Sequence, residues 1–226
     1  MITPARLAAA LAALALIAGA PPRAMANTLV PLASDKPGDT LAVFYSGDGG
    51  WGSLDADVAR YLAANGVPTI GVNSLAYFRT KRSPEGAAED LAAALREYGA
   101  LWGRTKVVLV GYSFGADALP AIVPKLPDDI RAQVGHLVLI GTGPRGDLHF
   151  HPTSWLNIPA RDSFPARPAI TALTDLKITC VYGAKEHADI CASLPDAQVA
   201  KVRLPGGHHF NGDYASLGDV VLKAIR

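Results

Sequence analysis

The sequence is poor in cysteine and has almost no charge imbalance. It contains two cysteines in 226 residues, and 21 Lys and Arg residues stand against 20 Asp and Glu residues. So few cysteines exclude a disulfide-stapled scaffold, and this charge balance provides neither the basic surface that nucleic acid needs nor an acidic tail. No repeat, low-complexity tract or linker-like segment divides the chain. The composition therefore fits one globular domain and no nucleic-acid partner.

The N-terminus has the three parts of a secretory signal peptide. Arg6 precedes an apolar run that ends near Ala20, and the small-residue motif Ala-Met-Ala ends at Ala26. A membrane anchor is the alternative, but the run is shorter than the roughly 20 residues that span a bilayer. We therefore expect export with cleavage after residues 1–26, which leaves 27–226 as a single mature domain.

Export would place the two cysteines in an oxidising compartment. There a pair of thiols normally closes, so the sequence predicts a disulfide between Cys180 and Cys191. Two buried free thiols are the alternative. The loop between them is short, and the chain-entropy model gives a gain of about 3 kcal/mol.

Apolar runs alternate with amphipathic stretches along the mature chain. This alternation predicts an α/β fold with a mostly parallel sheet and helices on both faces. The predicted strands are 40–45, 67–72, 107–110, 136–140, 177–182 and 199–204. Four helices are predicted. Ser53 would cap the first, 53–65, and Ser83 would cap the second, 84–102; the others are a short helix that ends near 125 and the helix 217–225. Residues 143–173 are irregular and proline-rich, with an edge strand expected near 148–151 and at most a minimal lid.

One motif points to nucleophilic catalysis. Gly111-Tyr112-Ser113-Phe114-Gly115 lies between a predicted strand and a predicted helix. In that context G-x-S-x-G is typical of a nucleophile elbow, where small residues permit a sharp turn that exposes the serine hydroxyl. An ordinary strand-to-helix turn is the alternative. The pattern makes Ser113 the candidate nucleophile.

A serine nucleophile needs a base and an acid. His208 and His209 follow the last predicted strand, and Glu186 and Asp189 follow the strand before it. The chain order serine, acid, histidine is that of the α/β-hydrolase fold. Glu186 is the first choice of acid because it lies three residues after Gly183, where that strand ends; Asp189 is the alternative. For the base we favour His209 over His208, since His-Phe-x-Gly follows as in related hydrolases.

The remaining histidines predict no metal site. His136, His149, His151 and His187 lack the spacing of metal ligands, so neither a metal nor a cofactor is expected.

An oxyanion hole would need two backbone N–H groups. The sequence offers Phe114, directly after Ser113, and Asp48, in the glycine-rich loop 46–50 after the first long strand. A plain tight turn is the alternative for that loop. Its glycines do not have the spacing of a dinucleotide-binding fingerprint.

Charged residues near the elbow suggest groups that bind substrate. Asp117 lies one helical turn beyond Ser113 and would suit an ammonium group, or it is a first-turn charge that the helix dipole favours. Arg79, Lys81 and Arg82 precede a helix N-terminus, which is a natural phosphate site. For these three residues the sequence favours the alternative of solvated loop charges.

The chain resembles the VirJ/AcvB family of bacterial virulence proteins, which are exported α/β-hydrolases. The matching segments span most of the mature chain: 46–51 with Trp51, 77–78 with 82–85, 111–117, Cys180 with 182–183, and 206–210 with 212–214. The resemblance implies a periplasmic serine hydrolase, with Trp51 beside the substrate.

The resemblance also implies substrates and partners. The AcvB branch implies cleavage of the aminoacyl ester of lysyl-phosphatidylglycerol at the membrane surface, and the VirJ branch implies association with type IV secretion components. A catalytically silent adaptor of such a system and a generic carboxylesterase are the alternatives, because a fold by itself does not guarantee an activity.

Overall fold

The computed structural model describes residues 23–151 and 160–226 of the chain. Of the predicted signal peptide, residues 1–22 lie outside this part. Its last residues form α1 (Arg23–Ala26), whose Met25 side chain is fully buried in the core. Cleavage after Ala26 therefore removes one core side chain, and the signal peptide stays a prediction. Within the described residues, no helix combines the length and the apolar character needed to cross a bilayer.

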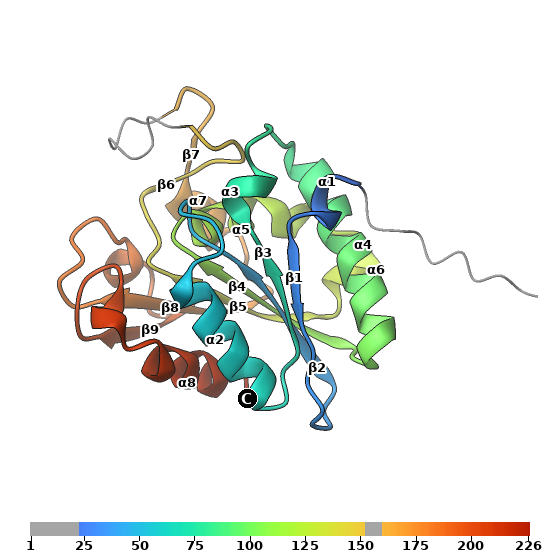
Figure 1. Ribbon diagram of the computed structural model, residues 1–226. Coiled ribbons are helices and arrows are strands. Elements are labelled where there is room, and N and C mark those ends of the chain that lie inside the picture. Colours follow the sequence, from blue (N-terminus) through green and yellow to red (C-terminus); the bar gives the residue numbers. More distant parts are fainter. Residues whose placement is uncertain (1–22, 152–159) are drawn as a thin grey trace, which may run out of the picture.

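A seven-stranded sheet forms the centre of the molecule (Figure 1). Its strands run in the order β1-β3-β2-β4-β5-β8-β9. All neighbours are parallel except β1 and β3. The strands are β1 (Leu29–Leu32), β2 (Thr40–Tyr45), β3 (Thr69–Val72), β4 (Lys106–Tyr112), β5 (Val134–Ile140), β8 (Lys177–Gly183) and β9 (Val199–Leu204). The predicted mostly parallel α/β fold is confirmed.

Helices cover both faces of the sheet. On one face α2 (Ser53–Ala64) and α8 (Tyr214–Ala224) pack against each other, in front of the sheet in Figure 1. The other face carries α4 (Pro84–Trp102), α5 (Phe114–Ile122) and α7 (Ala166–Thr171). Shorter helical segments are α3 (Ser74–Tyr77), α6 (Asp128–Arg131) and the 3₁₀ turns η1 (Val123–Lys125), η3 (Cys191–Ser193) and η4 (Phe210–Gly212).

The side chains of β2 alternate between two hydrophobic cores. Leu41, Val43 and Tyr45 pack into the core beneath α4 and α5, whereas Ala42 and Phe44 pack into the core beneath α2 and α8. Because a parallel strand is buried on both faces, it reads as an unbroken apolar run rather than an alternating one. This is why strand 40–45 was recognisable in the sequence.

Two helix starts show what sequence capping rules capture. At α4 the Ser83 hydroxyl accepts the Gly86 N–H at 3.0 Å, as expected. At α2 the expected cap was wrong: Ser53 is the first helical residue and Gly52 is the N-cap. The Gly52 N–H donates to the Asp55 carboxylate at 2.9 Å. The side-chain hydrogen bond at the start of this helix therefore comes from Asp55 and not, as expected, from Ser53.

The irregular region also differs from expectation. No edge strand forms at 148–151; instead β6 (Arg145–Gly146) pairs antiparallel with β7 (Phe164–Pro165). The backbone of the expected strand bonds to another loop, because Leu148 accepts the Arg82 N–H at 2.9 Å and Phe150 donates to the Phe78 carbonyl at 2.8 Å. The Leu148 carbonyl and the Phe150 N–H therefore bond to this loop rather than to a neighbouring strand.

Candidate active site

Ser113 occupies a sharp turn between β4 and α5. Its backbone lies at φ 51° and ψ −117°, outside the regions that residues with a side chain normally adopt. Such a conformation costs about 1–3 kcal/mol and persists only where its surroundings enforce it. The Ser113 N–H donates to the Ile140 carbonyl at 2.8 Å, and the Ser113 carbonyl accepts the Asp117 N–H at 3.0 Å. The turn therefore has the geometry expected of a nucleophile elbow.

The two glycines of the motif are required by close backbone approaches. A Cβ atom at Gly111 would lie 2.5 Å from the Gly115 carbonyl oxygen, and one at Gly115 would lie 2.4 Å from the Tyr45 carbonyl oxygen. The Gly115 oxygen belongs to α5 and the Tyr45 oxygen to β2, so neither can move aside without disturbing a helix or the sheet. Any side chain at either position therefore opens the turn that presents Ser113.

The residue in contact with Ser113 is His208. Its Nε2 atom lies 2.8 Å from the Ser113 Oγ, a normal hydrogen-bond distance. Gly141 makes room for the ring, because a Cβ atom there would lie 2.9 Å from the His208 Cε1. The expected preference for His209 was wrong in this respect: His209 is exposed, and its Nδ1 lies 3.0 Å from the Tyr112 hydroxyl instead.

Glu186 lies on the other side of the His208 ring. Its Oε2 atom is 3.3 Å from the His208 Nδ1. Bonds to the end of β9 hold its loop, since Ala184 donates to the Leu204 carbonyl and Lys185 donates to the Gly206 carbonyl, both at 2.7 Å. The first-choice acid is therefore the one that reaches the imidazole.

Asp189, the alternative acid, accepts a different hydrogen bond. Its Oδ1 takes the Cys191 N–H at 2.6 Å, and its Oδ2 is buried without a hydrogen-bond partner among the described residues. Cys191 forms the predicted disulfide with Cys180, so one covalent link closes the loop that carries both carboxylates. The prediction of the disulfide is confirmed.

Burial sets the protonation of His208. Its pKa lies below the ordinary histidine value, chiefly because burial disfavours the imidazolium, and the nearby Glu186 charge opposes this only in part. The ring is therefore neutral at pH 7. With its proton on Nδ1, toward Glu186, the Nε2 atom is free to accept the Ser113 proton.

The two expected oxyanion donors lie beside Ser113. Phe114 is the first residue of α5, so its N–H has no partner within the helix. Asp48 lies in a turn closed by the Gly50 N–H, which donates to the Gly47 carbonyl at 3.1 Å. Asp48, Ser113 and Phe114 all line one pocket.

That pocket, of 620 Å³, is strongly acidic. Five of its lining residues are carboxylates, and Arg145 is the one Lys or Arg among its described lining residues; the acids are Asp48, Asp117, Asp147, Glu186 and Asp189. Burial raises the pKa of Asp189 to about 6 and holds the pKa of Asp117 well above its ordinary value. The Asp117 Oδ1 accepts the Gly143 N–H at 2.8 Å. These carboxyls gain most from a cationic ligand, which would restore their charged forms.

The other residues expected to bind substrate lie elsewhere. The Trp51 ring packs edge-on against Phe44 and over Gly71, where a Cβ atom would lie 2.3 Å from it. Arg79 is exposed, and the Arg82 guanidinium stacks 4.7 Å above the Tyr77 ring. None of the three lines the pocket. The structure therefore places the three side chains outside this pocket, and their contact with substrate stays a prediction.

Sequence reasoning missed three contributors to the site. Gly141 makes room for the His208 ring, and Tyr112 donates its hydroxyl to the His208 carbonyl at 3.2 Å. Asp147 lines the pocket from the irregular region. A glycine directly after β5 was the only one of these signals that the sequence carried, since β5 also ends at the edge where Ser113 lies.

The described residues contain two groups with metal-ligand chemistry. One is Cys180, Asp189 and Cys191, whose sulfurs are consumed by the disulfide. The other is His149, His151 and Asp162. The structure thus brings together two histidines that their spacing did not mark as ligands.

Solved structures share this fold at low sequence identity. An alpha-beta serine hydrolase homologue from Coxiella burnetii is 17% identical with a TM-score of 0.60, and the match covers 88% of this chain and 91% of that one. Naproxen esterase from Bacillus subtilis is 11% identical with a TM-score of 0.62, covering 88% and 87%. A serine hydrolase without lid from Xanthomonas campestris is 17% identical with a TM-score of 0.54, covering 88% and 86%. The likeness shows the α/β-hydrolase fold.

Sequence comparison identifies the family. No curated protein matches the chain. The family described as bacterial virulence protein (VirJ) matches residues 39–226, a range that includes Ser113, Glu186 and His208. Because this match extends over most of the chain, the protein belongs to the VirJ family of bacterial virulence proteins.

Proposed function

We propose that this protein is a periplasmic serine hydrolase that cleaves the aminoacyl ester of lysyl-phosphatidylglycerol-type lipids. The observation that carries the proposal is the contact of the Ser113 Oγ with the His208 Nε2 at 2.8 Å, with Glu186 on the far side of the ring. A hydroxyl, an imidazole and a carboxylate in this order form the catalytic triad that nucleophilic ester hydrolysis uses.

The chemistry follows from these contacts. The Ser113 Oγ attacks the ester carbonyl carbon while its proton passes to the His208 Nε2. The N–H groups of Phe114 and Asp48 stabilise the negative oxygen that develops. His208 then gives the proton to the departing lipid alcohol, and the acyl group stays on Ser113. A water molecule, deprotonated by His208, attacks this acyl ester and releases the free amino acid.

The acidic pocket supports a cationic acyl group. A lysyl group carries two ammonium groups, and Asp117 and Asp189 lie in the pocket with Ser113. The buried Asp189 Oδ2 has no hydrogen-bond partner among the described residues, so it offers an acceptor to an ammonium. The resemblance to the AcvB branch suggests the lipid, and membership of the VirJ family suggests type IV secretion components as partners.

The test is lipid mass spectrometry of vesicles that contain lysyl-phosphatidylglycerol. We expect the wild-type protein to convert this lipid to phosphatidylglycerol and free lysine, and Ser113→Ala to leave it intact. Asp117→Asn keeps the side-chain size but removes the charge. It should reduce the preference for the lysyl over the alanyl lipid by about tenfold, the value of a hydrogen bond to a charged group.

Three outcomes contradict the proposal. If wild type and Ser113→Ala consume the lysyl lipid equally, Ser113 is not the nucleophile. Turnover of short neutral esters without any turnover of the lipid indicates a generic carboxylesterase. An unchanged preference in Asp117→Asn removes the assigned role of that carboxylate.

A further inference from the structure

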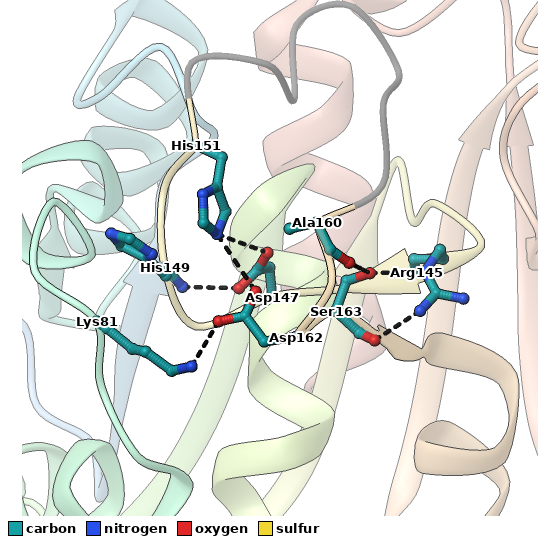
Figure 2. Close-up of polar contacts among 8 residues, drawn as sticks. All are labelled: Lys81, Arg145, Asp147, His149, His151, Ala160, Asp162 and Ser163. Carbon is teal, nitrogen blue, oxygen red and sulfur yellow. Dashed lines mark hydrogen bonds and ion pairs between the residues drawn. The ribbon is translucent and has the colours of Figure 1, made fainter.

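A second polar cluster lies on the irregular region beside the pocket. Figure 2 shows it: Asp147, His149 and His151 come from the segment after β6, and Asp162 comes from the segment before β7. Candidate ligand atoms of His149, His151 and Asp162 all lie within 4.8 Å of one another. The cluster shares only Asp147 with the pocket that Ser113 lines.

The distances within this cluster fit a metal better than hydrogen bonds. The buried His151 Nε2 lies 3.4 Å from the Asp162 Oδ1 and 3.6 Å from the Asp147 Oδ2, and it makes no hydrogen bond of normal geometry with a described residue. Tetrahedral zinc has ligand bonds of about 2.0–2.2 Å, which place neighbouring ligand atoms about 3.3–3.6 Å apart. The observed gaps therefore match the separation of two atoms that share one ion.

The backbone around the cluster is already held in place. Arg145 donates to the Ser163 Oγ at 2.7 Å and to the Ser163 carbonyl at 2.6 Å, and the Ser163 hydroxyl donates to the Ala160 carbonyl at 2.7 Å (Figure 2). On the other segment, the Arg82 N–H donates to the Leu148 carbonyl at 2.9 Å. Such outer bonds fix ligand-bearing segments before the ion arrives, which is what a metal site requires.

We propose that His149, His151 and Asp162, with Asp147 as the fourth ligand, form a structural zinc site. Two neutral imidazoles and two carboxylates are ligands that zinc accepts, and the carboxylates balance its charge. Closing the site needs the side chains to move closer, because ligand atoms up to 4.8 Å apart must come to about 3.3–3.6 Å, and Asp147 must turn toward the other three. Zinc in this position would tie the two segments together beside the pocket wall formed by Arg145, Gly146 and Ala160.

Lys81 is the competitor of the metal. Its Nζ lies 2.5 Å from the Asp162 Oδ2, and its side chain is 64% exposed, so it can leave for solvent when the ion binds. The alternative to zinc is a protonated His151 that bridges Asp147 and Asp162 as a plain ion pair. The two alternatives predict different effects of removing Lys81: a zinc site should bind the ion more tightly, and a plain ion pair should not.

The experiment measures bound zinc in the purified protein. Protein stripped with a chelator is dialysed against Zn²⁺, freed of unbound ion, and assayed for zinc by elemental mass spectrometry. We expect about one zinc per wild-type chain, and almost none in His151→Ala or in Asp162→Asn, the milder change for a variant that must stay folded. When stripped protein is titrated with Zn²⁺ against a competing chelator, Lys81→Ala should bind zinc about two- to fivefold more tightly, since it loses one exposed ion pair.

His187→Ala is the matched control, because His187 is an exposed histidine outside the cluster. It should keep the full zinc content, with folding of each variant checked by circular dichroism. The proposal is overturned if wild type retains no zinc, if His151→Ala and Asp162→Asn retain as much as wild type, or if His187→Ala loses it. Unchanged or weaker affinity in Lys81→Ala equally contradicts it and favours the plain ion pair. None of these readouts depends on hydrolase activity, so they do not test the proposed function.

Discussion

At the scale of single residues, the pocket is defined by carboxyls that burial keeps partly protonated. Removal from water contributes most to both raised pKa values; the Asp189 charge adds to that of Asp117, and the Glu186 charge adds to that of Asp189. Such groups bind a cation best once they ionise. An acid with a pKa of about 6, like Asp189, therefore makes cation recognition depend on pH within a range that is easy to measure.

The pH dependence of selectivity follows from this. Below pH 6 Asp189 is mostly protonated, and above pH 6 it is mostly charged. We expect the ratio of kcat/KM for lysine ethyl ester to kcat/KM for norleucine ethyl ester to rise about tenfold between pH 5 and pH 7. The two esters differ in the side-chain ammonium, and the titrations of His208 and of the α-amino group affect both alike, so they cancel in the ratio.

The matched variant is Asp189→Asn, which cannot ionise. Its ratio should stay nearly flat over the same pH range. A flat ratio in the wild-type protein, or the same rise in Asp189→Asn, would remove Asp189 from cation recognition.

The sequence indicated the serine and the acid of the site, but it did not show which of two adjacent histidines is the base. Ser113 and Glu186 were indicated by their distances from strand ends. His208 and His209 are adjacent after the same strand, and the choice between them depends on Gly206, which adopts φ 95° before the turn, and on the Tyr112 hydroxyl that bonds to His209. Both are tertiary features that sequence spacing does not carry.

At the scale of elements, the acid loop depends on a covalent clamp. Cys180 lies within β8 and Cys191 begins η3, so the disulfide closes the loop that carries Glu186 and Asp189. Both cysteine side chains are fully buried. The loop is also tied to the sheet edge by the Ile190 N–H, which donates to the Thr142 carbonyl at 2.9 Å.

Removing the disulfide should therefore affect stability and activity together. We expect the Cys180→Ala/Cys191→Ala double variant to lose about 3 kcal/mol in the free energy of unfolding, measured by urea denaturation. Its kcat should fall more than its KM rises, because Glu186 loses its fixed position beside His208. Reductant should lower the stability of the wild-type protein in the same way and leave the double variant unchanged. Equal stability of the two proteins would contradict the clamp.

Long elements were more predictable than short ones. The limits of strands 40–45 and 199–204 and of the helix 84–102 agree with the sequence pattern, because buried apolar runs and a Ser-Pro start mark them. β1 was missed: it has four residues, and its Pro31 argues against a strand except at an edge, where it lies. α3 has four residues and β6 has two, so tertiary contacts determine these elements and not a periodicity of their own.

At the scale of the whole molecule, three distant segments meet at one edge of the sheet. Ser113 follows β4, Glu186 follows β8 and His208 follows β9. Because these strands are parallel, their carboxyl ends lie at the same edge, where α/β proteins bind ligands. The sequence order of these residues and the α/β pattern were enough to predict this meeting. The acidic lining was not predictable in full, because Asp147 comes from the irregular region.

The whole of the proposed chemistry depends on one claim, that His208 activates Ser113 as a nucleophile. The most direct measurement is the rate at which a fluorophosphonate probe labels the intact protein, read as a mass increase per chain. Wild type should take up one label, and Ser113→Ala none. His208→Ala should be slowed on the order of a thousandfold or more, and His209→Ala should stay within about threefold of wild type. Labelling of Ser113→Ala at the wild-type rate, or a slow His209→Ala beside a fast His208→Ala, would contradict the claim.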